Sequence, residues 1–352
     1  MTQNSCWCGN NNFVPFGPAY GECRVCGTLV SLKGLSNDQL RVINDERDFY
    51  GKEYWLKHQE TDLGFPDIYI RARKDLTERN LHWLSVLLKY RLPPANTMEL
   101  GCAHGSFVAL MKQAGYHASG IEMSPWVVAF GKDAFGIDLN VGPVESLKLD
   151  GQSLDVIVLM DVLEHLPDPD STMRRCFELL KPDGLVLIQT PRYREETSYT
   201  TLVESIDPFL QMLKTDEHLY LFSNRSITYL FRSLGAEHIC FEPAIFAQYD
   251  MFFAVSRASL QANTPDEIES ALLSTPNGRI TLALLDLFRK WEESEADRAA
   301  RLEQIVELTK LLKESEADRA ARLEQIVELT RVVEDKRWWR LPARWRKRIR
   351  NG

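Results

Sequence analysis

The sequence predicts an α/β protein with a doubly wound core, a small cysteine module before the core and a long helix after it. Three observations carry this prediction. Residues 97–122 have the pattern of a strand, a glycine turn, a helix and a second strand. Four of the seven cysteines fall within the first 26 residues. One segment occurs at 293–309 and again, unchanged, at 314–330.

Composition narrows the class of protein. A chain of 352 residues with 44% hydrophobic content can form a sizeable core and more than one structural unit. Its net charge of -8 argues against a general nucleic-acid-binding surface. There is no long apolar run and residues 1–12 are polar, so we expect neither a membrane span nor a signal peptide. The odd number of cysteines fits a reducing compartment, and we expect a cytoplasmic protein of a bacterial type.

The first expected element is a zinc ribbon-like module at 1–35. Its cysteines form a C-x-C-G pair and a C-x-x-C-G pair: Cys6, Cys8, Cys23 and Cys26. Two thiolate pairs, each followed by glycine, are typical of tetrahedral zinc coordination, although the C-x-C pair is tighter than usual. Redox chemistry is the alternative, but no thioredoxin-like pattern surrounds the cysteines. A closed site with four thiolates predicts a structural Zn²⁺ without a catalytic role.

Residues 36–93 are helical in pattern and rich in aromatic side chains. One interpretation is an N-terminal helical cap that packs on the core. A second adds that "DFYGKEYW", residues 48–55, closes over a ligand and that its tyrosines line the pocket. Pro93 and Pro94 mark the boundary before the core domain, which we place at 94–258.

The first turn of the core indicates the kind of ligand. Gly101 and Gly105 lie where a strand turns tightly into a helix, and backbone approaches ligands closely at such turns. A dinucleotide-binding loop would have the pattern G-x-G-x-x-G, whereas here an acid, Glu99, precedes the first glycine and would repel a phosphate. Glu122 ends the next strand, where an acid can hold ribose hydroxyls. A positively charged nucleoside without phosphate, such as S-adenosylmethionine, suits both acids.

Several motifs carry a resemblance to a known family. The stretch "ELGCAHG" at 99–105 and the acid at 122 are followed by "SLDVIVLMDVLEHLPDP" at 153–169 and "LLKPDGLVLIQTP" at 179–191. In this order they resemble the class I S-adenosylmethionine-dependent methyltransferases. The likeness covers under half of the chain and implies a seven-stranded, Rossmann-like core. Without it, an ordinary doubly wound domain would be the alternative.

The resemblance also assigns residues to the donor. It implies that Glu99, Gly101 and Gly105 hold the methionine end, and that Glu122 and its neighbour Met123 lie at the ribose. The remaining positions are expected at the adenine, Val144 and Glu145, and at the end of the fourth strand facing the donor, Met160 and Asp161.

Two histidines compete for the role of general base. His165 lies in "DVLEHLPDP", which is common to these enzymes whatever their acceptor, so we expect it to support the loop. His218 lies in "DEHLYLFSNRSI", after the fifth strand, where acceptor-facing segments insert. This piece and the cysteine module resemble methyltransferases of nucleotide-linked sugars, in which a Glu-His pair supplies the base. We therefore predict His218 as base, oriented by Glu217; the alternative is that His218 only caps or packs.

The predicted acceptor follows from what those relatives have and this chain lacks. The sugar enzymes that methylate carbon have a large C-terminal domain, and this chain has the repeat helix and the basic tail in its place. This difference argues against carbon methylation and favours a hydroxyl acceptor. The main hypothesis is O-methylation of a nucleotide- or lipid-linked glycan in surface-polysaccharide biosynthesis. The alternative is O-methylation of a quinone precursor or another small hydroxyl metabolite, as in ubiquinone-type methyltransferases. From another class, the chain could be a non-catalytic scaffold.

After a linker predicted at 259–285, the repeat predicts a long helix at 286–335. The period of 21 residues is three heptads, which favours a coiled coil and a homo-oligomer. The apolar positions with 3,4 spacing are Leu302, Ile305, Leu312, Leu323, Ile326 and Val333. Four charged residues fall on the same seam and would weaken it: Glu295, Arg298, Glu316 and Arg319. A solitary charged helix is the alternative.

The tail at 336–352 reverses the charge of the chain. It holds eight basic residues and no acid, so the rest of the chain carries -16. Tryptophan interleaved with arginine suits an anionic membrane surface, and we expect peripheral contact with the inner face of a membrane. A merely solvated tail is the alternative, and we expect no nucleic-acid partner.

Overall fold

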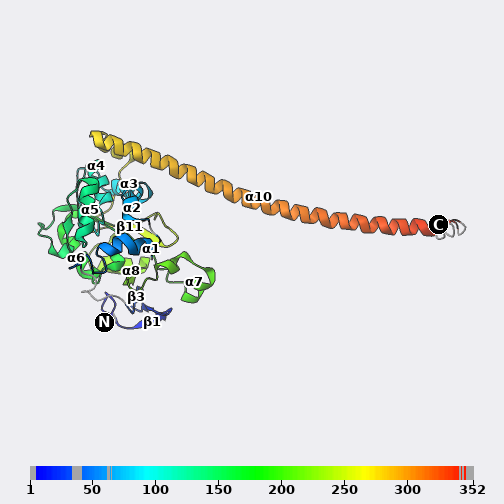
Figure 1. The fold of residues 1–352 in the computed structure, drawn as a ribbon, viewed down its shortest axis with the longest axis horizontal. Helices are drawn as coiled ribbons and strands as arrows, with labels where there is room; N and C mark the ends of the chain where they lie inside the picture. The colour runs from blue at the N-terminus through cyan, green and yellow to red at the C-terminus, as the bar shows by residue number, and fades with distance from the viewer. Residues whose placement is uncertain are drawn as a thin grey trace. The chain divides into compact units, whose positions relative to one another are not determined.

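The computed structural model describes residues 5–33, 42–61, 64, 66–340, 342 and 345. These residues belong to two compact units, Met1–Asp286 and Leu287–Gly352. Figure 1 traces the element order along the chain. All of the strands that the structure describes lie in the first unit, so the candidate site is built within it.

A seven-stranded sheet forms the centre of the first unit. Its order is β10-β11-β8-β7-β4-β5-β6, with β11 antiparallel to β8 and to β10. The five strands from β8 to β6 are parallel. This confirms the predicted doubly wound, seven-stranded core. The strands are β4 Asn96–Leu100, β5 His117–Glu122, β6 Asn140–Val141, β7 Leu154–Met160, β8 Leu180–Pro191, β10 His238–Glu242 and β11 Asp250–Ser256.

The central strands show little alternation between polar and apolar residues, because both of their faces are buried. All seven residues of β7 are buried, because β7 lies between β4 and β8 in a sheet covered on both faces. The carboxyl ends of parallel strands meet at one edge of such a sheet, and ligands bind there. Leu100, Glu122 and Met160 are the last residues of β4, β5 and β7, so the predicted donor residues come together at this edge.

The described residues of the first unit form nine α-helices before α10 (Pro276–Arg340) begins. They are α1 Gln59–Thr61, α2 Ile68–Asp75, α3 Leu81–Tyr90, α4 Ser106–Ala114, α5 Pro125–Phe135, α6 Pro169–Leu179, α7 Tyr199–Ser205, α8 Asn224–Ser233 and α9 Pro265–Leu273. Two π-helical turns, Tyr54–His58 and Leu76–Asn80, interrupt the cap. Short 3-10 turns span Val144–Ser146, Leu163–His165 and Pro208–Met212.

Local sequence sets where the core helices begin and end. In α5, Ser124 is the N-cap, and its hydroxyl accepts a hydrogen bond from the backbone N–H of Val127. Pro125 follows in the first turn, and Gly136 ends the helix in a left-handed conformation. This arrangement places the start of α5 directly after Glu122 and Met123, at the edge where the strands end.

The N-terminal cysteine module is part of a second, antiparallel sheet. Its strands are β1 Phe13–Phe16, β2 Tyr20–Cys23 and β3 Leu29–Ser31, and they lie near the N-terminus in Figure 1. The fourth strand, β9 at Tyr220–Leu221, comes from the segment that follows His218. Leu29 pairs with Leu221, and Val30 with Tyr220. The module therefore shares a sheet with the region predicted to face the acceptor.

The predicted linker at 259–285 is largely helical, which corrects that prediction. It contains α9 and the start of α10, which spans Pro276–Arg340. Thr264 and Glu267 form a capping box, in which the Thr264 hydroxyl accepts from the Glu267 N–H at 3.3 Å. Pro265 then occupies the first helical turn, where proline is favoured rather than disruptive.

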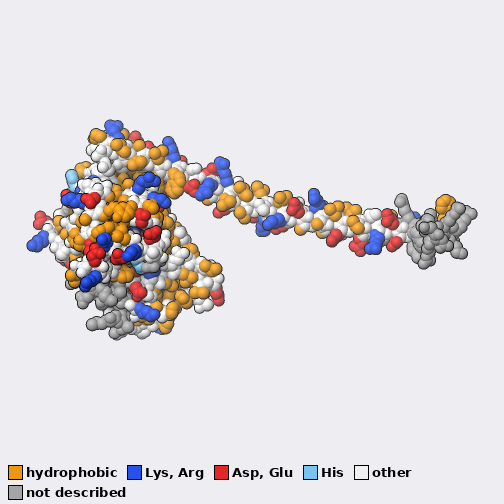
Figure 2. Space-filling view, in the orientation of Figure 1, with side chains coloured by type: hydrophobic (Ala, Val, Ile, Leu, Met, Phe, Trp, Pro, Cys, Tyr) orange, Lys and Arg blue, Asp and Glu red, His pale blue; other side chains and the backbone are white. Residues whose placement is uncertain are grey.

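The second unit is the C-terminal part of α10. The whole helix has 65 residues, which corresponds to about 98 Å at 1.5 Å per residue. Each repeat holds an ion pair at i,i+4 spacing, Arg301 with Asp297 and Arg322 with Asp318. Apolar side chains remain exposed between the charged ones (Figure 2), including Ile305 and Ile326. The long helix is present, and its pairing with a second chain stays a prediction.

The basic tail predicted at 336–352 lies mostly outside the described residues, so its membrane contact stays a prediction. Within the described part of the chain, no helix has a segment both long and apolar enough to cross a bilayer.

Candidate active site

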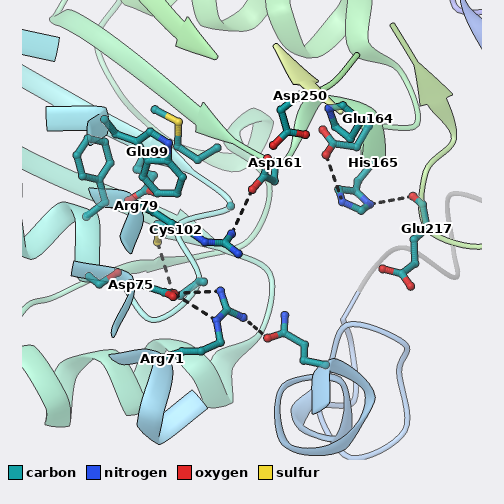
Figure 3. Close-up of a pocket in the computed structure, with 18 of the residues that line it drawn as sticks. Arg71, Asp75, Arg79, Glu99, Cys102, Asp161, Glu164, His165, Glu217 and Asp250 are labelled. Carbon is teal, nitrogen blue, oxygen red and sulfur yellow. Dashed lines mark hydrogen bonds and ion pairs between the residues drawn. The ribbon is translucent and has the colours of Figure 1, made fainter. Parts of the chain in front are cut away.

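Two adjoining cavities open at the carboxyl ends of β4, β5 and β7. The first has a volume of about 440 Å³ and the second about 540 Å³. Five residues line both cavities, which places the two side by side: Tyr54, Trp55, Gly101, Asp161 and His165. Figure 3 shows the first cavity with its charged residues converging from the cap, the sheet edge and the loops.

The glycine turn after β4 shapes the boundary between the cavities. Gly101 has a φ of +61°, and a Cβ added there would lie 2.6 Å from the Val162 Cγ2 atom. Only glycine fits this turn, which lets the backbone reach the ligand space. Gly105 lines neither cavity. It has a φ of +75°, and a Cβ added there would lie 2.6 Å from the Ile137 Cδ1 atom, which gives it a conformational role at the turn; its contact with the methionine end stays a prediction.

Glu99 offers a buried carboxyl group to the first cavity. Its Oε2 atom has no hydrogen-bond partner among the described residues. Burial and, secondarily, the nearby charge of Glu122 raise the pKa of Glu99 well above its usual value. A buried acceptor without a partner is costly, and a cationic ammonium group of a ligand would satisfy it.

Glu122 is held by three backbone donors. Its Oε2 accepts from the Ala103 N–H at 3.1 Å, and its Oε1 accepts from the N–H groups of Met123 at 2.7 Å and Ser124 at 3.2 Å. Burial is the main cause that raises the pKa of Glu122. A carboxylate has about four acceptor positions, so Glu122 can still accept from ligand hydroxyls in the second cavity.

The other predicted donor residues also lie at these cavities. Met123, Val144 and Glu145 line the second cavity, and Met160 lines the first. Asp161 lines both and has a φ of +59°, which is unusual for a residue other than glycine. Its Oδ1 accepts from the Gln189 amide at 3.0 Å, and its Oδ2 lies 3.6 Å from Arg79.

The two histidines that competed for the base lie together in the first cavity. The ring centroids of His165 and His218 are 5.0 Å apart. The Nδ1 of His165 is 2.8 Å from the Glu217 carbonyl oxygen, and that of His218 is 2.7 Å from the Met212 carbonyl oxygen. A carbonyl can only accept, so each Nδ1 donates, and each Nε2 carries a lone pair while the ring is neutral.

Burial favours the neutral form of both rings. It is the main cause that lowers the pKa of His165, and it lowers the pKa of His218 well below the usual value, with the charge of His165 adding to the effect. Both imidazoles are therefore neutral near pH 7, with their Nε2 atoms available to accept a proton or bind an electrophile.

The predicted pairing of Glu217 with His218 is not present. The Glu217 carboxylate lies 3.0 Å from the His58 Nε2 atom, on the cap. Instead of a neighbouring acid, the Met212 carbonyl orients His218. Adjacent residues of an irregular segment point in different directions, so proximity in sequence did not predict this contact. His58 was missed because no local pattern links it to a residue so distant in the chain.

The cap contributes to both cavities through its two π-helical turns. Tyr54 and Trp55 come from the first turn, and Arg79 and Asn80 from the second. Such turns are rare and frequently occur at functional sites. The Tyr50 hydroxyl lies 3.2 Å from the His165 Nδ1 atom. These contacts agree with the interpretation in which residues 48–55 close over the ligand.

Several cavity residues have no clear signal in the sequence. Arg71 pairs with Asp75 at 3.1 Å and also bonds to Gln59, and Arg79 reaches Asp161 from the same cap (Figure 3). Asp250 begins β11 beside them, where burial and the charge of Asp161 raise its pKa to about 8. For Asp250, the only signal in the sequence was an acid at the start of an apolar run, and that signal is weak.

The four N-terminal cysteines form a compact cluster without disulfides. Their sulfur atoms lie within 4.8 Å of one another, with 3.5 Å between Cys6 and Cys26 and between Cys8 and Cys23. Zinc–sulfur bonds of about 2.3 Å in a tetrahedron imply sulfur separations of about 3.8 Å, so this set fits the ion. The Asn10 amide also donates to the Cys23 sulfur at 3.2 Å, as groups around bound thiolates do.

Comparisons with known proteins address the core. Residues 72–240 match the family model described as a methyltransferase domain. The chain is 28% identical over 141 residues to the ubiquinone biosynthesis O-methyltransferase of Xanthomonas campestris pv. campestris, covering 38% of this chain and 59% of that protein. It is 31% identical over 131 residues to the protein of the same name from Haemophilus ducreyi, covering 34% and 55%.

Both alignments span less than two thirds of these relatives. Among solved structures, a possible histamine N-methyltransferase from Thermotoga maritima is 16% identical, with a TM-score of 0.40. The match covers 54% of this chain and 96% of that structure.

Proposed function

We propose that this chain, whose residues 72–240 form a methyltransferase domain, uses S-adenosylmethionine to methylate a hydroxyl group of a small acceptor. The observation that carries the proposal is the pair of joined cavities with a buried acid in each. Glu99 presents an unpartnered oxygen in the first cavity, and Glu122 presents an oriented carboxylate in the second. A ligand that is cationic at one end and a ribonucleoside at the other satisfies both.

Placement of the donor follows from this chemistry. Its ammonium group would meet Glu99, and its ribose hydroxyls would donate to Glu122. The second cavity continues from Glu122 past Val144 and Glu145, which leaves room for the adenine. The sulfonium would then lie near Gly101 and Asp161, where the two cavities adjoin, with its methyl group toward the first cavity.

The reaction requires alignment and the removal of one proton. The donor supplies a methyl group already activated on a positively charged sulfur. The acceptor oxygen forms a bond to the methyl carbon as the carbon–sulfur bond breaks, and the hydroxyl proton leaves the acceptor. His218 is the base that we favour, because it lines the first cavity and its Nδ1 is held by the Met212 carbonyl, which leaves the lone pair on Nε2.

The relatives favour a small hydroxyl acceptor over the glycan that was our main hypothesis. Both curated relatives carry the name ubiquinone biosynthesis O-methyltransferase, which supports the alternative of a quinone precursor or a similar compound. Aromatic side chains of the first cavity also suit an aromatic ring: Tyr54, Trp55, Phe246 and Tyr249. A non-catalytic scaffold would have no need for both cavities, which argues against that class. The fit of the cysteines supports a structural zinc ion beside the enzyme core.

A turnover assay with isotope-labelled donor tests the function. Phenolic quinone precursors and nucleotide-linked sugars should be compared as acceptors, and we expect methyl transfer to a phenol. His218→Ala should lower turnover about 10²–10⁴-fold, the usual effect of losing a general base. His117→Ala, at an exposed site at the start of β5, is the matched control. Donor binding without transfer to any acceptor would favour the scaffold, and transfer to sugars alone would restore the glycan hypothesis.

A further inference from the structure

Three side chains converge on the wall of the first cavity, and we call them the Glu-His-His cluster: Glu164, His165 and His218. One ligand atom from each lies within 4.8 Å of the other two. All three line the cavity that would receive the acceptor. Figure 3 shows Glu164 and His165 side by side, near Glu217. The Nε2 of His165 lies 3.9 Å from a Glu164 carboxylate oxygen.

Other groups already hold each member of the cluster in place. Backbone carbonyls accept from Nδ1 of both histidines, which turns both Nε2 lone pairs away from the backbone. The Glu164 Oε2 atom accepts from the Thr190 hydroxyl at 2.9 Å, so Oε1 is the oxygen nearer the histidine. Metal-binding histidines almost always donate their second ring N–H in this way, and ligating carboxylates are held by hydrogen bonds too.

The three residues of the Glu-His-His cluster come from two parts of the chain that are bonded to each other. Glu164 and His165 are on the 3-10 turn after β7, and His218 lies two residues before the start of β9. The backbone N–H of Leu219 donates to the Glu164 carbonyl at 2.9 Å, which ties one part to the other. Glu164 and His218 are buried and His165 is partly buried, so none of the three cluster residues lies on an exposed loop.

We propose that the Glu-His-His cluster binds a divalent transition-metal ion of the zinc or cobalt type, which holds the acceptor oxygen. The proposal rests on the methyl-transfer function proposed above and deepens it. Two histidines and one carboxylate are a ligand set of catalytic zinc sites and of open iron(II) sites, which leave positions for substrate. A point equidistant from three atoms at this spacing is within about 2.8 Å of each, so modest side-chain movement reaches the usual 2.0–2.2 Å.

A bound cation would change how the acceptor loses its proton. The acceptor hydroxyl oxygen binds the ion, which lowers the hydroxyl pKa, and the proton passes to water. The oxygen then bonds to the methyl carbon, and the electron pair of the carbon–sulfur bond stays on sulfur. In that state His218 is a ligand and no separate base is needed. A phenol with two adjacent hydroxyls could chelate the ion, which fits the acceptor class proposed above.

Cobalt(II) titration separates this site from the cysteine cluster. The full chain is first saturated with zinc, which fills the thiolate site, and labile metal is removed with a mild chelator. Cobalt is then added, and d–d absorption in visible light reports the ion bound to nitrogen and oxygen. Binding of S-adenosylhomocysteine, measured by calorimetry on the same samples, reports the folded donor site.

We expect one further cobalt equivalent without a thiolate charge-transfer band. His165→Ala and His218→Ala should each weaken cobalt binding at least 10-fold, in line with the loss of a ligand. Glu164→Gln keeps the shape of the side chain and should weaken binding too. His117→Ala should bind cobalt as the parent does. Each variant should retain S-adenosylhomocysteine binding, which excludes unfolding as the cause.

The outcomes distinguish the two proposals. Normal S-adenosylhomocysteine binding without a second cobalt equivalent would overturn the metal site and leave the histidines as bases. Cobalt binding that survives both histidine substitutions would also overturn it. If cobalt binds but S-adenosylhomocysteine does not, the proposed methyl transfer fails while the metal site stands.

Discussion

The hydroxyl of Tyr20, in the cysteine module, donates a buried hydrogen bond to the backbone carbonyl of His218 at 3.0 Å. A second, partly buried hydrogen bond runs from the Ser31 hydroxyl to the Thr215 carbonyl at 2.8 Å. Together with the pairing of β3 and β9, these contacts fix both ends of the segment that presents His218 to the first cavity. The cysteine module thus positions a residue of the candidate active site, although none of the module's described residues lines either cavity.

Tyr20→Phe tests this positioning role. The change removes one buried hydrogen bond and should cost about 1 kcal/mol of unfolding free energy. Turnover should fall several-fold, while affinity for S-adenosylhomocysteine stays as in the parent, because the donor cavity does not contact Tyr20. Steady-state kinetics and calorimetry measure the two effects. Tyr229→Phe is a matched control, since Tyr229 contacts Trp7 of the module through its ring alone. Equal turnover in both variants would contradict the role.

Zinc removal tests the module as a whole. We expect one tightly held zinc ion per chain, and we expect a strong chelator or Cys23→Ser to lower the melting temperature and the turnover together. The physical reason is that β2 and β3 are held by the cysteine loops at their ends, and β3 supports β9. Elemental analysis and thermal unfolding measure the result. A preparation with reduced thiols, full turnover and no bound zinc would show that the ion has no part in the structure.

Glu99→Gln tests the donor site. The variant keeps the shape of the side chain but loses the charge that would pair with the ammonium group. Affinity for S-adenosylhomocysteine should fall about 10- to 100-fold, the usual scale for a hydrogen bond to a charged group. Glu122→Ala should also weaken binding, through the loss of its ribose contact. Glu237→Gln, at an exposed site, is the control. Unchanged affinity for the Glu99 and Glu122 variants would refute the donor assignment.

His104 predicts a pH dependence of stability. Burial, with a smaller effect of Arg71, lowers its pKa to about 4, and both ring nitrogens lack hydrogen-bond partners among the described residues. The Asp75 carboxylate lies 4.0 Å away and acts in the opposite direction. From pH 6.5 down to 4, the unfolded chain binds a proton that the folded chain does not. Stability should therefore fall with decreasing pH, by up to about 3 kcal/mol in total.

His104→Leu should remove most of that loss. Denaturant unfolding at several pH values between 4 and 7, without donor, measures it in the parent and in the variant. The variant should also be at least as stable as the parent at pH 7, because two unpaired polar atoms leave the interior. Parallel pH profiles for the two proteins would show that His104 does not carry the effect.

The repeat helix predicts self-association. On the seam, Leu302, Ile305 and Ile326 are each more than half exposed in the single chain, and a second copy with the same heptad pattern would cover them. Sedimentation equilibrium should show an oligomer for the full chain. A double variant, Ile305→Asn with Ile326→Asn, should shift it toward monomer. Gln304→Asn with Gln325→Asn, off the seam, should not. A monomeric parent at high protein concentration would contradict the coiled coil.

Local chemistry was enough to predict much of this protein. The glycine turn between Glu99 and Gly105 specifies a strand-to-helix junction because few other residues adopt its conformation. The buried apolar strand β7 and the long helix with its heptads could also be predicted from the sequence, because each pattern arises within one segment. Glu122 was also found from its place at a strand end, because the ends of parallel strands converge in any sheet of this type.

Contacts between distant segments needed the tertiary structure. The meeting of His165 with His218, the bond of Glu217 to His58 and the support that Tyr20 gives to β9 each join residues with no shared local pattern. Spacing along the chain decides which side chains share one helix or strand face. Which faces then pack together depends on burial and hydrogen bonding summed over the whole unit, and that sum decided the geometry of the first cavity.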